Sequence, residues 1–179
     1  MKTPPSSSGM SASLDETRQH GFSLIELIIT ITLIGILASV AVPSYRDTVE
    51  KNRLNAALQS LKGDLQLARS ESIKRSSVVT LSTSSGASGS WCYGLTESST
   101  GCDCSQPSSG SNFCEIRRVL GSDHESTSLT SSMNISFDSR RSATTATSLG
   151  VTSANHSAQI NVNSAGLSRV CGGDLYAAC

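Results

Sequence analysis

The sequence predicts an α+β fold in which a long N-terminal helix packs on an antiparallel β-sheet domain. A continuous apolar run covers residues 22–42, and residues 43–75 then repeat apolar side chains at helical spacing. From residue 76 the pattern changes to short alternating segments between clusters of Ser, Thr, Gly and Asn. We therefore divide the chain into a polar leader (1–21), a transmembrane helix (22–42), an amphipathic helix (43–75) and a Ser/Thr-rich β-domain (76–179).

The apolar run is long enough to cross a membrane, because its 21 residues rise about 1.5 Å each and so span a hydrocarbon core of about 30 Å. Glu26 is its one charged residue, and a charge there costs about 2.5–3.5 kcal/mol on insertion scales. No Lys or Arg lies in the run to pair with it. Cleavage after Gly21 would place a new amine on Phe22, one helical turn before Glu26. This arrangement is more typical of a helix that assembles with other helices than of an enzyme active site.

Pro43 lacks an amide donor, so it marks either the end of the membrane helix or a kink in a longer one. The following pattern favours the kink, because apolar residues recur at spacings of three and four as far as about Lys74. This stripe consists of Leu54, Leu58, Leu61, Leu65 and Ala68. The charged residues fall mostly off the stripe: Arg53, Lys62, Asp64, Arg69 and Glu71. We expect the stripe to pack against the sheet.

Five segments of the β-domain predict strands, at residues 78–81, 91–95, 116–120, 133–137 and 158–163. The tract at residues 84–90 predicts a hairpin loop or a disordered tip, and other Ser/Thr-rich stretches predict long loops. The formal net charge is zero, and residues 76–179 hold five basic and seven acidic side chains. This balance argues against a general attraction to nucleic acid or anionic lipid.

The order Gly21-Phe22-Ser23-Leu24-Ile25-Glu26, followed by an apolar stretch and Pro43, resembles the leader and N-terminal helix of type IV pilins and type II secretion pseudopilins. The resemblance implies a pilin-like fold, cleavage after Gly21 and N-methylation of Phe22 by a prepilin peptidase. It also implies a filament of other pilin or pseudopilin subunits, in which Glu26 meets the N-terminal amine of a neighbour. The expected location is the inner membrane, with the C-terminal domain periplasmic, and then the pilus or pseudopilus.

Two simpler interpretations compete with this one. A plain signal anchor has the same length but does not explain Glu26, and a signal peptide cut after Ala41 usually has an apolar core of only about 7–15 residues. The basic residues that flank the run place its C-terminal side in the cytoplasm. Against that count, six cysteines favour an oxidising compartment, and we adopt the periplasmic orientation.

Two later segments resemble the GspH/FimT family of minor pilins: Phe137-Asp138-Ser139-Arg140-Arg141, which the resemblance places at the end of a penultimate strand, and Ile160 to Cys171. Relatives that bind DNA for natural transformation carry a Gly-Arg-x-Arg motif where this chain has Gly166-Leu167-Ser168-Arg169. The candidate DNA-binding residues are Arg169, Arg140, Arg141, Arg117 and Arg118. We interpret them as solvated charges at strand edges, and DNA binding is the alternative function.

The six cysteines are Cys92, Cys102, Cys104, Cys114, Cys171 and Cys179. Six cysteines allow 15 pairings. The pilin resemblance implies a bond between Cys171 and Cys179, whereas Cys102 and Cys104 are expected to bond outward, to Cys92 and Cys114 in an order that stays open. A zinc site is disfavoured because there is no Cys-x-x-Cys pair. His124 and His156 lack a neighbouring nucleophile motif, so we predict a structural minor pilin or pseudopilin with no cofactor and no enzymatic activity.

Overall fold

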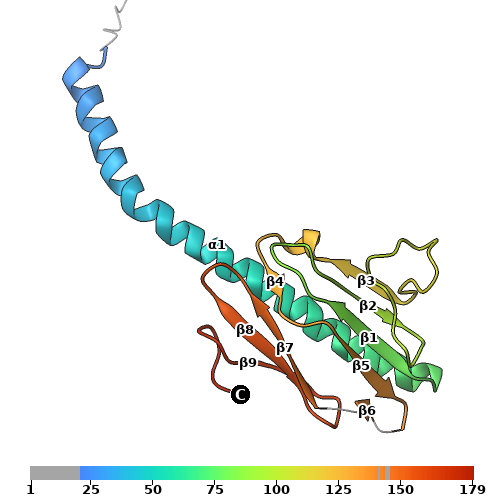
Figure 1. Ribbon diagram of the computed structural model, residues 1–179. Coiled ribbons are helices and arrows are strands. Elements are labelled where there is room, and N and C mark those ends of the chain that lie inside the picture. Colours follow the sequence, from blue (N-terminus) through green and yellow to red (C-terminus); the bar gives the residue numbers. More distant parts are fainter. Residues whose placement is uncertain (1–20, 141, 144–145) are drawn as a thin grey trace, which may run out of the picture. The chain divides into compact units, whose positions relative to one another are not determined.

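The computed structural model describes residues 21–140, 142–143 and 146–179. The chain divides into two compact units, Met1–Ala41 and Val42–Cys179, and helix α1 (Leu24–Arg75) contributes to both (Figure 1). Most of the predicted leader, residues 1–20, lies outside the described residues. The second unit is called the body below.

α1 is continuous through Pro43, so this proline does not end the helix. In the body, one face of α1 is buried. The five residues of the predicted stripe are each at most 1% exposed, which confirms the expected packing face. The helix ends at Arg75, where Ser76 adopts a left-handed conformation with φ of 53°. Lys74 and Arg75 lie in the last turn, where positive charge is favoured by the helix dipole.

The strands form two antiparallel sheets (Figure 1). A five-stranded sheet has the order β3-β2-β1-β5-β6, and a four-stranded sheet has the order β4-β7-β8-β9. The first contains β1 (Val79–Ser84), β2 (Cys92–Thr96), β3 (Arg117–Leu120), β5 (Met133–Asp138) and β6 (Ser142–Ala143). The second contains β4 (Ser128–Leu129), β7 (Thr147–Thr152), β8 (Ser157–Val162) and β9 (Ser168–Cys171), and a short 3-10 helix, η1 (Gly121–His124), follows β3.

The five predicted strands are present as β1, β2, β3, β5 and β8. Four strands were not predicted, among them β7, which lies in a stretch that was expected to be loop. Its sequence buries only Leu149 and Val151, which alternate with exposed or half-buried residues, as in a strand with one face on the core. The turn at Asp138–Arg140 follows β5, and four strands come after β5 along the chain. The expectation that this turn ends the penultimate strand is therefore wrong.

One hydrophobic core joins the stripe of α1 to both sheets. Its largest fully buried side chains from the strands are Tyr93, Phe137, Leu81, Leu95, Leu149 and Ile160. β1 lies between β2 and β5, which accounts for the burial of five of its six residues. All buried core residues of the described chain lie between Leu54 and Cys171, so the body carries its own core.

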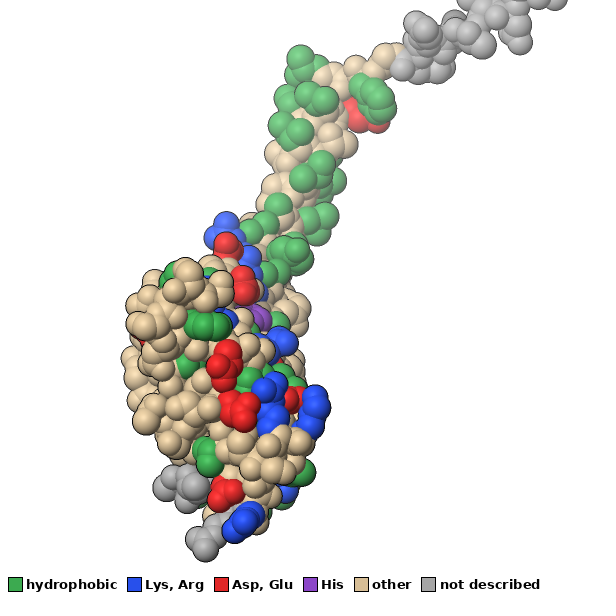
Figure 2. Space-filling model, turned by 90° about the vertical axis from the view of Figure 1, so that its right-hand side faces the viewer, with side chains coloured by type: hydrophobic (Ala, Val, Ile, Leu, Met, Phe, Trp, Pro, Cys, Tyr) green, Lys and Arg blue, Asp and Glu red, His purple; other side chains and the backbone are tan. Residues whose placement is uncertain are grey.

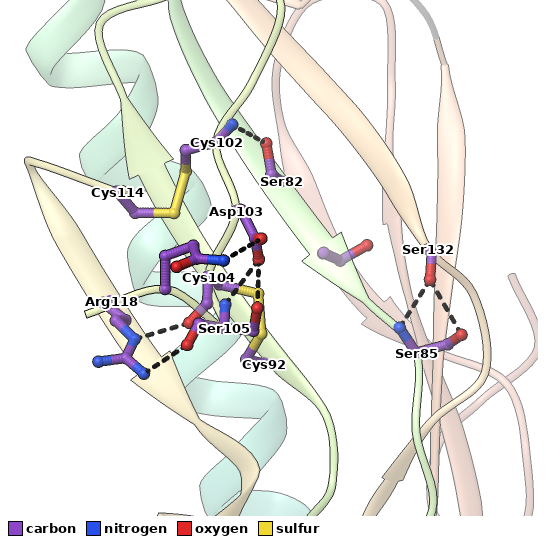
Figure 3. The surroundings of a disulfide bond; sticks show 12 residues. Ser82, Ser85, Cys92, Cys102, Asp103, Cys104, Ser105, Cys114, Arg118 and Ser132 are labelled. Carbon is purple, nitrogen blue, oxygen red and sulfur yellow. Dashed lines mark hydrogen bonds between the residues drawn. A yellow bond between two sulfur atoms is a disulfide. The ribbon is translucent and has the colours of Figure 1, made fainter. Parts of the chain in front are cut away.

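Three disulfides crosslink the body: Cys92–Cys104, Cys102–Cys114 and Cys171–Cys179. The first joins β2 to the loop at residues 97–116, and the second closes this loop on itself (Figure 3). The third closes the segment that follows β9. Such bonds contribute about 2–4 kcal/mol each to small domains, which offsets the polar composition of these loops.

His156, in the turn between β7 and β8, connects three parts of the body. Its Nε2 lies 2.7 Å from Asp47 Oδ1 of α1, and its Nδ1 contacts Asp174 of the C-terminal segment. Asp174 also accepts a hydrogen bond of 2.8 Å from the backbone amide of Ser157. Two carboxylates therefore face the two ring nitrogens, an arrangement that suits the doubly protonated imidazolium. No pattern in the sequence predicted this role for His156.

The surroundings of His156 favour its charged form. Hydrogen bonds to Asp174 and then to Asp47 raise the pKa of His156, although its side chain is only 10% exposed. The bond from His156 in turn lowers the pKa of Asp174 to about 2. On α1, Lys51 lies 2.8 Å from Asp47, and Glu50 accepts two hydrogen bonds from Asn155. These contacts attach the β7–β8 turn and the C-terminal segment to the helix.

Replacing Gly94 by Ala should destabilise the body, because a Cβ there would lie 2.3 Å from Cys114 Sγ. We expect the free energy of unfolding to fall by about 1–3 kcal/mol, the usual cost of overpacking. Chemical denaturation of an oxidised fragment, residues 44–179, measures this. In the control, Gly63→Ala adds a Cβ with nothing within 4 Å on an exposed part of α1, and should raise stability by about 0.4–1 kcal/mol. Equal stabilities of the two variants would contradict the packing at Gly94.

The His156 contacts should make the stability of the body depend on pH. Since folding raises the pKa of His156, its contribution is complete below the unfolded value of about 6.5 and is lost as the pH rises through the folded-state pKa. We expect the thermal midpoint of residues 44–179 to fall over this range, and to fall less in His156→Gln. The control is His124→Gln, which removes a histidine whose ring stacks on Trp91 instead of contacting carboxylates. An unchanged pH profile in His156→Gln would refute the role of this contact.

Candidate functional site

The described part of the first unit is an apolar helical surface (Figure 2). Its large hydrophobic side chains are 44–85% exposed, with Ile28 and Phe22 at the two limits. α1 contains an 18-residue window of mean hydropathy 2.5, none of it buried, so by length and composition it can cross a membrane. A soluble monomer rarely exposes apolar surface of this extent. Lipid or other protein chains must therefore cover this segment.

Three hydroxyl groups on the helical part of this segment are satisfied by the helix itself. Thr30, Thr32 and Ser39 each donate a hydrogen bond of 2.6–2.8 Å to the backbone carbonyl three residues earlier. Such bonds lower the cost of placing a hydroxyl in an apolar environment. They leave the carboxylate of Glu26 as the polar group that the helix itself does not satisfy.

Glu26 lies in the first turn of α1 and has no hydrogen bond or ion pair with any described residue. The positive end of the helix dipole provides part of what an acid requires there. The backbone hydrogen bonding of the helix starts with the amide of Leu27, which donates to Ser23 at 3.1 Å. Phe22 therefore lies two residues before the first helical residue, Leu24, and four residues before Glu26. An amine at Phe22, on this chain or another, has the positive charge that could pair with the Glu26 carboxylate.

Arg117, a candidate for DNA binding, is paired with a buried acid of the body, although its own side chain is 47% exposed. Its Nε donates to Asp64 Oδ2 at 2.8 Å, and the hydroxyl of Tyr93 donates to the same oxygen, also at 2.8 Å. Burial raises the pKa of Tyr93 well above its usual value, so this hydroxyl remains a donor. Asp64 is 4% exposed, which corrects its placement off the buried face of α1. Its position three residues after Leu61 was the available signal.

The remaining candidate arginines that the structure describes come from different elements. Arg118 donates hydrogen bonds to the carbonyls of Cys104 and Ser105, at 2.6 and 3.4 Å, and so supports the crosslinked loop (Figure 3). Arg140 is exposed in the turn after β5, and Arg169 is exposed on β9. Arg141 lies outside the described residues. β3 and β9 are edge strands of different sheets, so the described candidates do not gather on one element.

Comparisons with known proteins give consistent results for the two units. Residues 17–42 match the prokaryotic N-terminal methylation motif, and residues 57–166 match type II transport protein GspH. The fimbrial protein EcpC of Eikenella corrodens is 47% identical over 45 residues, which are 25% of this chain and 29% of EcpC. The type IV major pilin protein PilE1 of Neisseria gonorrhoeae is 45% identical over 47 residues, 26% and 28% of the two chains. These matches thus span less than a third of the relatives.

A solved structure is similar in fold over most of its length. The type IV minor pilin FimU of Pseudomonas aeruginosa (strain PAO1) superposes with a TM-score of 0.52 at 16% identity, and the match covers 70% of this chain and 92% of FimU. At this identity the likeness concerns the fold. The GspH match covers more than half of the chain and agrees with the long helix, the antiparallel sheets and the N-terminal motif. The chain therefore belongs to the GspH family, within the superfamily of type IV pilins and pseudopilins.

Proposed function

We propose that this chain is a minor pilin or pseudopilin, a structural subunit of a type IV pilus or of a type II secretion pseudopilus. In this proposal the precursor lies in the inner membrane with its body in the periplasm. Prepilin peptidase cuts it after Gly21 and methylates the new amine on Phe22. The subunit then leaves the bilayer and joins other pilin subunits. Pilins and pseudopilins are structural subunits rather than enzymes, which agrees with the absence of a catalytic motif in the sequence.

The observation that carries the proposal is the lone carboxylate of Glu26 in an exposed apolar helix. In lipid it has no counter-charge from any described residue of its own chain. In a bundle of processed subunits, the amine on Phe22 of one subunit meets Glu26 of the next. N-methylation keeps that amine basic, so the ion pair persists after modification. A buried pair of this kind specifies position and register more than it adds stability.

Assembly exchanges contacts with lipid for contacts with other helices. Lipid tails are as apolar as the Leu and Ile side chains of this segment, so burial of apolar surface gives little net drive. Packing between helices and polar contacts must therefore supply the preference for the bundle. The hydroxyls of Thr30 and Thr32 are already bonded to their own helix, which leaves the Glu26 contact as the specific one. A pilus and a secretion pseudopilus share this step, so the proposal applies to both.

Glu26→Ala should leave membrane insertion intact and block incorporation into the filament, because it removes the counter-charge for the neighbouring amine. The measurement is the amount of subunit in sheared filaments relative to the amount in membranes. Thr30→Val is the matched control, since this hydroxyl is satisfied by its own helix. Mass spectrometry of the unchanged subunit should find an N-terminus at methylated Phe22. Normal incorporation of Glu26→Ala, or an N-terminus elsewhere, would refute the proposal.

DNA capture during natural transformation is the alternative function. Phosphate binding depends on several unpaired cations acting together. Asp64 neutralises Arg117, and Arg118 is bonded to backbone carbonyls, which reduces the available charge. We therefore expect a fragment of the body, residues 44–179, not to shift duplex DNA in a gel at low salt. Salt-sensitive binding that is lost in Arg169→Ala, and kept in the control Lys62→Ala, would instead support the alternative.

A further inference from the structure

A groove of about 320 Å³ lies between the C-terminal part of α1 and the turn that joins β8 to β9, elements that Figure 1 shows in the body. Ile73 of the helix and Leu167 of the turn both line it, and each is 57% exposed. The body has two other exposed large hydrophobic residues among those described, Val42 and Tyr45, and both lie at the N-terminal start of the body. Beyond its first residues, the described body thus exposes large hydrophobic side chains only in this groove.

The same groove holds a cation without a counter-charge. Arg69 lines it, its side chain makes no hydrogen bond or ion pair with any described residue, and its Nε is buried without an acceptor. Ser168 Oγ, on the opposite wall, is also buried and unsatisfied. By contrast, Arg75, less than two turns further along α1, pairs with Glu71 and Glu97 at 2.7 and 3.0 Å. Buried polar groups are normally paired. Two unpaired groups in one groove indicate that something from outside the chain completes it.

We propose that this groove binds an acidic side chain, flanked by apolar residues, of a neighbouring pilin subunit. The carboxylate pairs with the Arg69 guanidinium, whose fork of donors matches two carboxylate oxygens. The apolar residues beside it cover Ile73 and Leu167. The inference rests on the proposed function, because a subunit held in a filament has neighbouring subunits as its lasting partners.

The composition of the groove favours a protein carboxylate over a nucleic-acid phosphate. A phosphate backbone is bound by a row of cations, and its affinity grows with each one. Among the residues lining this groove there is one cation, and two large apolar side chains line the groove with it. A DNA strand would leave Ile73 and Leu167 uncovered. Interfaces between proteins, in contrast, combine apolar contacts with an Arg anchor.

The first test finds the occupant by photo-crosslinking in the full-length chain, in cells that assemble the filament. A photoreactive residue at position 70, on the groove, should crosslink to a pilin subunit within a few residues of an Asp or Glu. The same group at Gln59, exposed on α1 and not among the groove residues, is the control. A crosslink to DNA or to a protein other than a pilin, or the same products from both positions, would overturn the proposal.

The second test reverses the charge. Arg69→Glu should reduce incorporation into filaments about tenfold, in line with the usual strength of a hydrogen-bonded charge pair. Changing the crosslinked acidic residue of the partner to Lys should restore it. Lys62→Glu, the same reversal on α1 away from the groove, should assemble normally. If the Arg69→Glu body does not fold, Arg69→Gln replaces it and must show the same defect.

The outcomes separate this inference from the proposed function. If Glu26→Ala blocks assembly while both Arg69 variants assemble at the level of the unchanged chain, the docking site is refuted and the assembly role stands. If Glu26→Ala assembles normally, the proposed function fails, and with it the basis for a neighbouring subunit in the groove.

Discussion

One helix has to be compatible with two environments, and the rest of the molecule follows from this constraint. An α-helix satisfies its backbone hydrogen bonds internally, so the same element can lie in lipid, in a bundle or on a sheet. Along residues 24–41 of α1 the apolar side chains are exposed all around. In the body the apolar residues of α1 form a stripe from Leu54 to Ala68, and both sheets pack on this stripe. Only the distribution of side chains distinguishes the two parts.

The body compensates for a polar composition with directional contacts. A hydrophobic stripe provides attraction, but it does not by itself fix where a sheet lies along the helix. Two polar anchors do so: Asp64 binds Tyr93 of β2 and Arg117 of β3, and Asp47 binds His156 beside β8. Each sheet thus has its own connection to α1 through a carboxylate on the helix. The disulfides act elsewhere, on the loop before β3 and on the C-terminal segment.

The sequence predicted the features that depend on strong local patterns. The stripe on α1 and five strands were found because spacing of three and four, or alternation, is visible within a few residues. β7 was missed because its core contacts depend on only Leu149 and Val151 in a run of Ser, Thr and Gly. The partners of Asp64 and His156 were missed for another reason. These partners lie 53 and 109 positions away along the chain, and no local pattern encodes such a pair.

The candidate arginines illustrate how function and structure compete for the same residue type. An arginine beside a strand can bind a phosphate or can satisfy a buried acid and free carbonyls, but it does not do both well. Here Arg117 and Arg118 are used for the second purpose. At the β8–β9 turn, Leu167 occupies the position that the sequence resemblance aligns with the first arginine of the Gly-Arg-x-Arg motif, and its exposed side chain lines the groove with Ile73 and the unpaired Arg69. Replacing charge by apolar surface at that turn weakens the attraction to phosphate and strengthens the attraction to protein. The same turn of the same fold thereby suits a contact between subunits.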